Sequence, residues 1–270
     1  MSKETCQRWR DGRARYRPAG EVFDTARASV QEIDERAAKA FTVQHHYARS
    51  YPAARFRAGL FLKERFAREA LVGVAVFSVP MSQGIIPHHF LGLDPHRGVE
   101  LGRLVLLDAI ASNAESWFVA RAFRLLKARL GAIDGVLSYS DPVERLAADG
   151  QIIKRGHVGI VYQALNATYL GRARGGTMIL SADGRIVSRR ALSKLRNDEC
   201  GAGYAYQQLR ALGAPARAPM EEGRDYTERA LREGGFRAVR HPGNHTYAWW
   251  LGARHARPDW AASSYPKAAP

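Results

Sequence analysis

Residues 100–107 read ELGRLVLL, residues 117–130 read WFVARAFRLLKARL, and residues 135–139 read GVLSY. The first and last of these stretches are short apolar runs, which are typical of buried strands. In the middle stretch the large apolar residues recur at spacings of three and four, which predicts a helix. The order is therefore a strand, a polar loop, a helix and a second strand, and it limits the fold classes open to the chain.

The flanking sequence adds further elements of both kinds. Helices are predicted over much of residues 22–41 and at 203–212 and 226–232, and a loop is predicted over 80–98. Strands are predicted at residues 58–62, 71–79 and 158–164, with a hairpin over 178–187 and a last strand pair at 236–239 and 246–251. Such interleaving predicts an α+β or α/β fold with a mixed, largely antiparallel sheet flanked by helices. It is compatible with the GNAT acyltransferase fold, in which two halves of a sheet splay apart.

Composition and periodicity suggest three regions. Residues 1–20 are polar and rich in arginine, which predicts a flexible basic arm. Residues 21–252 are expected to form the catalytic domain, with a core at 21–171 and a basic extension at 172–252. Residues 253–270 show no pattern and are expected to form a tail.

The 270 residues carry 41 Lys and Arg against 26 Asp and Glu, a formal charge of +15. An arginine-rich chain can result from coding bias. An excess of this size, however, causes self-repulsion in a folded domain, and binding of a polyanion offsets that repulsion, which favours nucleic acid as the partner. No apolar run is long enough to cross a membrane, and no signal peptide is recognisable. Cys6 and Cys200 are too few for a disulfide framework. A cytoplasmic protein is expected, in the host cell if a phage encodes it.

Several motifs of known chemistry are missing from the sequence. It contains no zinc signature, P-loop, dinucleotide fingerprint or nucleophile elbow. It also lacks the Arg/Gln-x-x-Gly-x-Gly/Ala loop that binds acyl-CoA in GNAT enzymes, and residues 112–117 (SNAESW) stand in its place. Ordinary use of acetyl-CoA is therefore not expected.

Three local groups of residues could carry chemistry. His45, His46 and Tyr47 follow the first predicted helix and suit a metal or a general base, although the residues by themselves favour capping of the helix and local hydrogen bonds. Arg103 lies in an apolar strand and Asp141 at the end of another, so the two could pair across adjacent strands as a site or as a structural ion pair.

The third group surrounds Gly159, a glycine inside the predicted strand 158–164 that would place Tyr162 on one face. A glycine within a strand marks either close approach of a ligand or a bulge. Aromatic residues mixed with arginines suit the stacking of bases and the binding of phosphates; they are Trp9, Tyr16, Tyr169, Arg172, Arg174, Arg189, Arg190, His245, Tyr247, Trp249 and Trp250. Trp249 and Trp250 point to opposite faces of a strand, so at most one is expected to stack on a base.

Taken together, several stretches resemble the Mom family of phage and prophage DNA-modification proteins. The similarity spans about residues 22–171, with a weaker match at 191–196 and 242–251. It rests on residues 30–41, 44–47 with Ser50, 71–80, 100–107, 113–118, 139–142 and 156–171.

The resemblance implies a GNAT-like fold and an enzyme that converts adenine in DNA to its N6-carbamoylmethyl derivative, protecting phage DNA from restriction. It also implies a link to iron, with His46 and Tyr47 as metal or donor-site residues. By the same comparison Arg103 and Asp141 are active-site residues, Tyr139, Ser140 and Tyr162 line the pocket, and Asn113, Ser116 and Trp117 bind the donor.

In this reading Asp141 accepts or relays a proton and Arg103 steadies the donor. The donor itself is not identified, and the target adenine must be flipped out or single-stranded. Two alternatives remain open from the residues: a GNAT-type acyltransferase acting on RNA, aminoacyl-tRNA or a small amine, and a non-catalytic DNA-binding protein.

Overall fold

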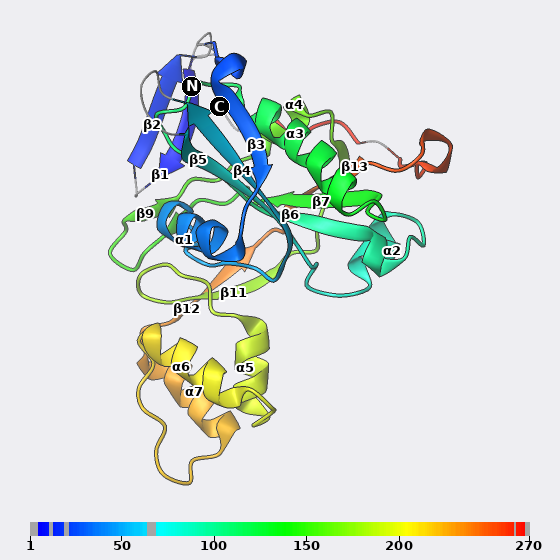
Figure 1. The fold of residues 1–270 in the computed structure, drawn as a ribbon. Helices are drawn as coiled ribbons and strands as arrows, with labels where there is room; N and C mark the ends of the chain where they lie inside the picture. The colour runs from blue at the N-terminus through cyan, green and yellow to red at the C-terminus, as the bar shows by residue number, and fades with distance from the viewer. Residues whose placement is uncertain (1–4, 11–12, 19–21, 64–68, 262, 268–270) are drawn as a thin grey trace. The chain divides into compact units, whose positions relative to one another are not determined.

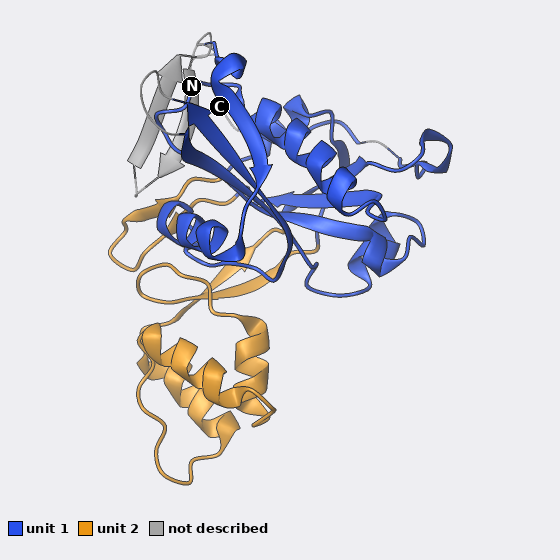
Figure 2. Ribbon diagram, viewed as in Figure 1, with its two compact units in different colours: residues 1–142, 157–173, 244–270 blue, residues 143–156, 174–243 orange. Residues whose placement is uncertain are grey.

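The computed structural model describes residues 5–10, 13–18, 22–63, 69–261 and 263–267 (Figure 1). The chain divides into two compact units (Figure 2). The first contains residues 1–142, 157–173 and 244–270, and the second contains residues 143–156 and 174–243. The chain thus leaves the first unit twice and returns to it twice.

The first unit is built on a seven-stranded sheet with the order β10-β13-β7-β6-β5-β4-β3. Its strands are β3 (Ala28–Glu32), β4 (Ala54–Lys63), β5 (Glu69–Ser78), β6 (Gly98–Leu106), β7 (Gly135–Ser140), β10 (Thr168–Arg172) and β13 (His245–Trp250). Neighbouring strands are antiparallel except for β6 and β7, which are parallel. The mixed, largely antiparallel sheet that the sequence predicts is confirmed.

Strands β6 and β7 pair over three residues, from Gly98–Gly135 to Glu100–Leu137. Beyond Glu100, β6 continues to Leu106 and β7 to Ser140 without pairing with each other. The sheet therefore splays open between them, as in the GNAT-like arrangement that the sequence predicts.

Helices cover both faces of this sheet (Figure 1). Helix α3 (Ala114–Arg129) packs against Phe77 and Leu101, whereas α1 (Glu35–His45) packs against Val74 and Val76 on the opposite face. Because β5 is buried on both faces, its sequence is apolar almost without interruption rather than alternating. The predicted strands at 58–62, 71–79, 100–107 and 135–139 and the helix at 117–130 are confirmed.

The helix predicted over residues 22–41 is wrong in its first half. That part forms a short 3-10 helix, η1 (Thr25–Arg27), and then the edge strand β3. Helix α1 begins only at Glu35, because the Asp34 side chain accepts a hydrogen bond from the Ala37 N–H at 2.8 Å and caps the helix there. The predicted loop 80–98 also contains α2 (Ile85–His89) and η2 (Pro95–Arg97).

Two strand predictions in the second half of the chain are also wrong. Residues 158–164 form the short helix α4 (Ile160–Ala164), which follows Gly159 in a left-handed conformation with φ +75°. The predicted pair at 236–239 and 246–251 does not pair with itself. Strand β12 (Arg237–His241) pairs with β11 (Gly176–Leu180), and β13 pairs with β7 and β10.

The second unit has a hydrophobic core of its own. It contains α5 (Arg189–Arg196), α6 (Ala202–Ala211), α7 (Gly223–Glu233), the β11–β12 pair and the small pair β8 (Arg145–Leu146) with β9 (Ile152–Lys154). Leu195, Leu209 and Tyr226 are fully buried between the three helices. The Asp183-Gly184 turn is present, but its second side is reduced to a single bridge between Leu180 and Ile186.

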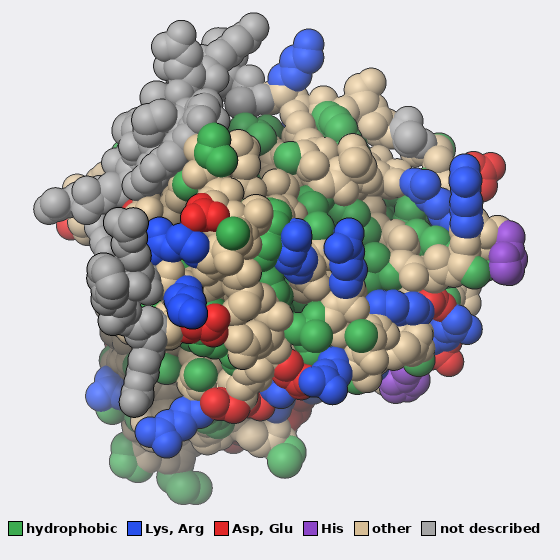
Figure 3. Space-filling view, turned by 45° about the horizontal axis from the view of Figure 1, so that its top comes forward, with side chains coloured by type: hydrophobic (Ala, Val, Ile, Leu, Met, Phe, Trp, Pro, Cys, Tyr) green, Lys and Arg blue, Asp and Glu red, His purple; other side chains and the backbone are tan. Residues whose placement is uncertain are grey.

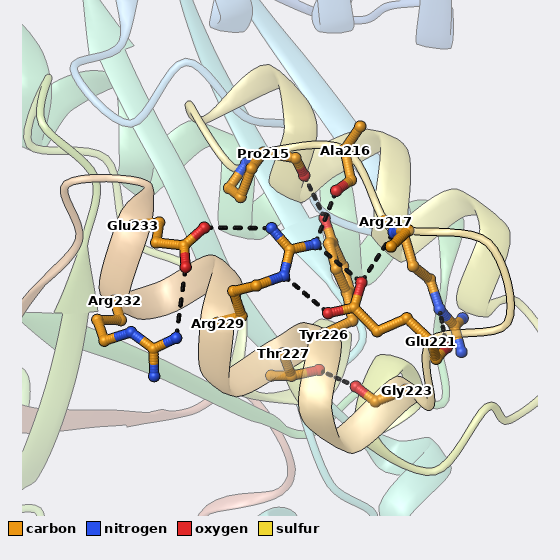
Figure 4. A network of polar contacts seen from close by, with 11 residues as sticks. Pro215, Ala216, Arg217, Glu221, Gly223, Tyr226, Thr227, Arg229, Arg232 and Glu233 are labelled. Atoms are coloured by element: carbon orange, nitrogen blue, oxygen red, sulfur yellow. Dashed lines mark hydrogen bonds and ion pairs between the residues drawn. The ribbon is translucent and has the colours of Figure 1, made fainter.

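The segment between α6 and α7 is held by arginine–carboxylate pairs (Figure 4). Arg229 donates to both oxygens of Glu221 at 2.7 and 2.8 Å, and also to Glu233 at 3.2 Å. Arg217 donates to both oxygens of Asp198 at 2.7 and 3.0 Å. The planar guanidinium matches a carboxylate with two parallel hydrogen bonds, so this geometry fixes the loop as well as neutralising its charge.

The two ends of the chain take up structure as well. The predicted basic arm contains a two-stranded hairpin, β1 (Thr5–Arg10) with β2 (Arg13–Pro18). The patternless tail includes η3 (Arg254–Ala256) and packs on the first unit, where the Trp260 indole donates to the His89 carbonyl and the Tyr265 hydroxyl to the Ala167 carbonyl. None of the helices in the described ranges is long and apolar enough to span a bilayer.

A buried carboxylate, Asp134, ties together the closed end of the splayed sheet. Its side chain accepts hydrogen bonds from Lys127 on α3, at 2.7 Å, and from Arg97 ahead of β6. Its backbone N–H donates to the Arg97 carbonyl, and its carbonyl accepts from the Leu251 N–H after β13. Asp134 thereby joins α3 to the ends of three neighbouring strands.

We expect Asp134→Asn to lower the free energy of unfolding by about 2 kcal/mol, because it leaves two cations facing a largely buried neutral group. Burial alone raises the pKa of Asp134, but Lys127 and Arg97 outweigh it and hold the pKa below its ordinary value. The stabilisation is therefore complete above that ordinary value and is lost as the pH falls through the lower pKa of the folded state. Urea denaturation followed by tryptophan fluorescence measures both effects.

The matched control is Glu32→Gln, which removes the exposed Glu32–Arg129 pair at the same helix end. This change is expected to cost less than about 0.5 kcal/mol. Equal losses in the two variants would contradict a special role for Asp134.

Candidate active site at the splayed strands

Five titratable side chains act on one another electrostatically around the point where β6 and β7 separate. Glu100, Arg103 and Tyr139 lie on the face of the sheet that carries Val76 and Leu137, whereas Tyr162 packs against Tyr247 and Trp249 on the α3 face. Glu100 and Arg103 come from β6, Tyr139 from β7, Tyr47 from the segment after α1, and Tyr162 from α4. Tyr47, Glu100 and Tyr162 are the groups whose charges act on Arg103, and Glu100 acts on both Tyr139 and Tyr162. Electrostatic interactions thus link residues from all three groups singled out in the sequence.

A β-bulge places Glu100 and Arg103 side by side. In a regular strand residues three apart point to opposite faces. Here Glu100 pairs with Ser78 and Arg103 with Val76, which leaves Gly102 as an extra residue between them. Because Ser78 and Val76 are two apart on β5, Glu100 and Arg103 lie on the same face. Gly102 is required, since a Cβ atom there would lie 2.5 Å from the Ser78 hydroxyl.

The Arg103 side chain is fixed by the segment that follows α1. Its Nε donates to the Ser50 carbonyl at 3.1 Å, and a terminal nitrogen donates to the Ser50 hydroxyl at 2.8 Å. The other terminal nitrogen donates to the Gly102 carbonyl at 2.6 Å. Burial lowers the pKa of Arg103 from its ordinary value, and the neighbouring acidic groups counteract that shift. Arg103 remains a positioned cation at neutral pH, because the ordinary arginine pKa is so high.

Glu100 is a functional candidate that the sequence prediction left out of its site. Burial raises the pKa of Glu100, and the charge of Arg103 offsets this in part. A carboxyl with a raised pKa holds a proton more readily than an exposed one, which is a property of general acids and bases. The signal in the sequence was a glutamate in an apolar strand, but the bulge that turns it towards Arg103 is not visible in the spacing.

Two phenols complete the cluster. Burial, together with the charge of Glu100, raises the pKa of Tyr139 to about 12. Burial is also the main reason that the pKa of Tyr162 is raised to about 12. Both hydroxyls therefore keep their protons at neutral pH, and the Tyr162 hydroxyl shares a side-chain hydrogen bond with Ser138.

Helix α4 presents Tyr162, and it is held close to the sheet. The Tyr247 hydroxyl and the Gln163 amide both donate to the Val158 carbonyl just before the helix. The Gln163 amide also reaches the Pro266 carbonyl in the C-terminal segment, at 3.3 Å. A Cβ atom on Gly159 would lie 2.8 Å from Tyr247, 2.9 Å from Tyr162 and 3.1 Å from Ser140. The sequence suggests close approach of a ligand or a bulge at this glycine, but the neighbours found there are side chains, and the glycine precedes a helix.

The proposed pairing of Arg103 with Asp141 is not found. Among the described residues, the Arg103 side chain forms hydrogen bonds with Ser50 and Gly102. Asp141 lies half-buried at the end of β7, where its carbonyl accepts a hydrogen bond from the His157 N–H at 3.0 Å. Ser140 is fully buried next to it. The splay explains the difference, because Asp141 follows the part of β7 that has already separated from β6.

His46 and Tyr47, which the family resemblance links to iron, make local contacts in the structure. His46 Nδ1 accepts a hydrogen bond from the Ala48 N–H at 3.1 Å, so in the neutral ring Nε2 carries the proton. Its ring packs against Tyr47, with centroids 4.3 Å apart. Among the described residues, no group of three His, Cys, Asp or Glu side chains is arranged to hold a metal ion.

The predicted donor-binding residues lie at the first turn of α3. Asn113 precedes the helix with φ +72°, and the Ser116 hydroxyl donates to its carbonyl at 3.1 Å. Trp117 packs edge-on against Phe23 and lies under the Arg121 guanidinium at 3.6 Å. Among the interactions described, none links these three residues to the Glu100–Arg103 cluster.

Most of the aromatic residues considered for base stacking belong to the interior. Tyr169, His245, Tyr247 and Trp249 are buried, and the Tyr169 hydroxyl is bonded to His245 Nδ1 at 2.8 Å. The Trp250 indole donates to the Ala253 carbonyl. The side chains of Trp9 and Tyr16 lie outside the described part of the chain. On the face shown in Figure 3, the described Lys and Arg side chains lie in several separate places among hydrophobic and neutral ones.

Comparison with known proteins gave three results. A model of the Mom protein family matches residues 27–214, more than half of the chain. No curated protein shows significant sequence similarity. A solved structure described as a tandem GNAT protein from the clavulanic acid biosynthesis pathway, without AcCoA, is similar with a TM-score of 0.41 and 10% identity. That alignment covers 84% of this chain and 99% of the other.

We expect Gly159→Ala to destabilise the first unit by more than about 2 kcal/mol, because the added methyl group meets Tyr247 and Tyr162 at a backbone conformation that already disfavours alanine. Gly171→Ala is the matched control. Gly171 also has a positive φ, +87°, but open space around its Cβ position, so only the conformational cost of about 1 kcal/mol applies. Urea denaturation compares the two, and equal losses would show that the close contacts do not matter.

Proposed function

The chain belongs to the Mom protein family, and we propose that it is a transferase that converts the N6 amine of adenine in DNA to its carbamoylmethyl derivative. One observation of the structure supports this proposal more than any other. A half-buried carboxyl, a fixed guanidinium and two phenols with raised pKa values interact electrostatically around the point where β6 and β7 separate. Such a cluster can bind a polar group and accept a proton in a partly water-excluded site.

The chemistry of adenine sets the task of these residues. The N6 lone pair is delocalised into the ring, so the amine is a weak nucleophile and needs a strong electrophile. In the proposed step the N6 electron pair forms a bond to the methylene carbon of a carbamoylmethyl donor. The bond from that carbon to its leaving group breaks, and the leaving group takes the electron pair. The proton lost from N6 then passes to a carboxylate of the enzyme.

We assign that proton to Glu100, with Asp141 as the candidate that the family resemblance supplies. Glu100 is buried beside Arg103, and its raised pKa favours capture of a proton once the N–C bond has formed. Arg103 is suited to hold the carbamoyl oxygen or an anionic part of the donor, because Ser50 and Gly102 leave its orientation little freedom. Tyr139 and Tyr162 are donors to the same group.

The base must leave the double helix to reach this cluster. In duplex DNA the N6 amine is paired, so an enzyme that alkylates it takes the base out of the stack or acts on a single strand. The proposed substrate is therefore a flipped or single-stranded adenine.

The proposal is tested by mass spectrometry of nucleosides from plasmid DNA co-expressed with the protein. A deoxyadenosine heavier by one carbamoylmethyl group is expected, and the measurement requires no knowledge of the donor. Unmodified DNA from folded protein would overturn the proposal and would favour acyl transfer to RNA or to a small amine.

In the same assay we expect Glu100→Gln to reduce modified adenine by at least about 100-fold, the usual contribution of a general base. DNA affinity should change less than about twofold, since the glutamine keeps the shape of the side chain. The wild-type rate should rise with pH through the raised pKa of Glu100, because the base acts in its deprotonated form. Asp141→Asn is the direct comparison. Full activity in Glu100→Gln with loss in Asp141→Asn would transfer the role to Asp141.

A further inference from the structure

Some arginines of the second unit are paired with carboxylates, and others have no such partner among the described residues. At the α6–α7 end, arginines are matched with carboxylates: Arg217 with Asp198, Arg224 with Glu228, and Arg229 with Glu221. At the end of the β11–β12 pair that connects to the first unit, Arg174, Arg189 and Arg240 have no carboxylate partner among the described residues. We call these three the ribbon arginines.

The ribbon arginines are brought together by the register of the two strands. Arg240 on β12 pairs with Thr177 on β11, and both residues are exposed. The Arg189 guanidinium donates to the carbonyl of the same Thr177. Arg174 precedes β11 by two residues and is exposed. The three arginines therefore lie at the same end of the ribbon, with Arg240 on the face that carries Thr177 and the Arg189 guanidinium on the face of Gly176.

A glycine makes room for one of them. A Cβ atom on Gly176 would lie 2.8 Å from the Arg189 guanidinium, so a larger residue would push the guanidinium away from the strand. Placing exposed cations at one end of the ribbon without an acid costs repulsion in the free protein. On the neighbouring helices several arginines are paired with carboxylates, including Arg190 with Glu199, whereas the ribbon arginines are not among the described residues so paired.

We propose that the ribbon arginines bind the phosphodiester backbone of the DNA substrate. The identification of DNA as the partner rests on the proposed function, whereas the identification of the binding surface rests on the positions of the three arginines. Exposed arginines on a two-stranded ribbon can donate to successive phosphate oxygens without reading the bases. In this proposal the second unit supplies affinity that is independent of the DNA sequence, and the site at β6 and β7 binds the adenine base.

The test measures binding of the full chain to a fluorescent 24-base-pair DNA duplex over a series of NaCl concentrations. Each lost phosphate contact lowers the slope of log K against log salt by about 0.9. Arg174→Ala with Arg240→Ala should therefore lower the slope by about 2 and weaken binding by at least about tenfold. Arg189 is left in place because its contact with Thr177 also supports the fold. The double variant Arg174→Lys with Arg240→Lys should restore most of the slope, because the contact depends on charge.

The matched control removes two arginines from α7, Arg224→Ala with Arg232→Ala. Both are exposed, and both already face carboxylates, Glu228 and Glu233. The control should leave the slope within about 0.5 of the wild-type value. An unchanged slope in the ribbon variant, or an equal loss in the control, would overturn the proposal.

Nucleoside mass spectrometry separates this proposal from the proposed function. If the wild-type protein modifies adenine but the ribbon variant keeps the full salt slope, the ribbon proposal fails by itself. If the ribbon variant loses the slope but the wild-type protein produces no modified adenine, the surface is confirmed and the proposed reaction fails.

Discussion

The separation of β6 from β7 after three paired residues is the constraint on which the site depends. A fully paired sheet would fill this position with backbone hydrogen bonds and leave no opening. The splay is sustained because its closed end is tied by Asp134 to α3, to the start of β6 and to the end of β13. A buried carboxylate with cationic partners suits this purpose, since its hydrogen bonds are directional where apolar packing is not.

The chemistry of the site follows from burial more than from the identity of any one residue. Glu100, Tyr139 and Tyr162 would titrate normally in water, but burial raises the pKa of all three, and the charge of Glu100 also raises the pKa of the two tyrosines. Arg103 supplies the opposing positive charge and is held by Ser50 and Gly102. The site therefore combines groups with raised pKa values with a fixed guanidinium. This combination suits the removal of a proton from an amine as the new N–C bond forms.

The second unit shows how one residue type serves two purposes. Arginines between α6 and α7 are bound to carboxylates in pairs that fix a loop, as with Arg229 and Glu221 (Figure 4). The ribbon arginines have no such partners among the described residues. The chain returns to the first unit at His157, whose N–H bonds to the Asp141 carbonyl, and near Asn244, whose carbonyl accepts from the Ala173 N–H. The two segments that form the second unit, 143–156 and 174–243, are therefore each flanked by residues of the first unit that are joined by a backbone hydrogen bond.

The sequence by itself determined the central strands, the helix between them, the mixed sheet and the family, because continuous apolar runs and helical spacing are local signals. It also singled out Arg103, Tyr139 and Tyr162. It did not reveal that residues 158–164 turn into a helix after Gly159, since an apolar run suits a strand equally well when backbone φ is unknown. The partnership of Glu100 with Arg103 was decided by tertiary structure. Residues three apart share a face of a strand only when a bulge shifts the register against the neighbouring strand, and that register is set by pairing with distant residues.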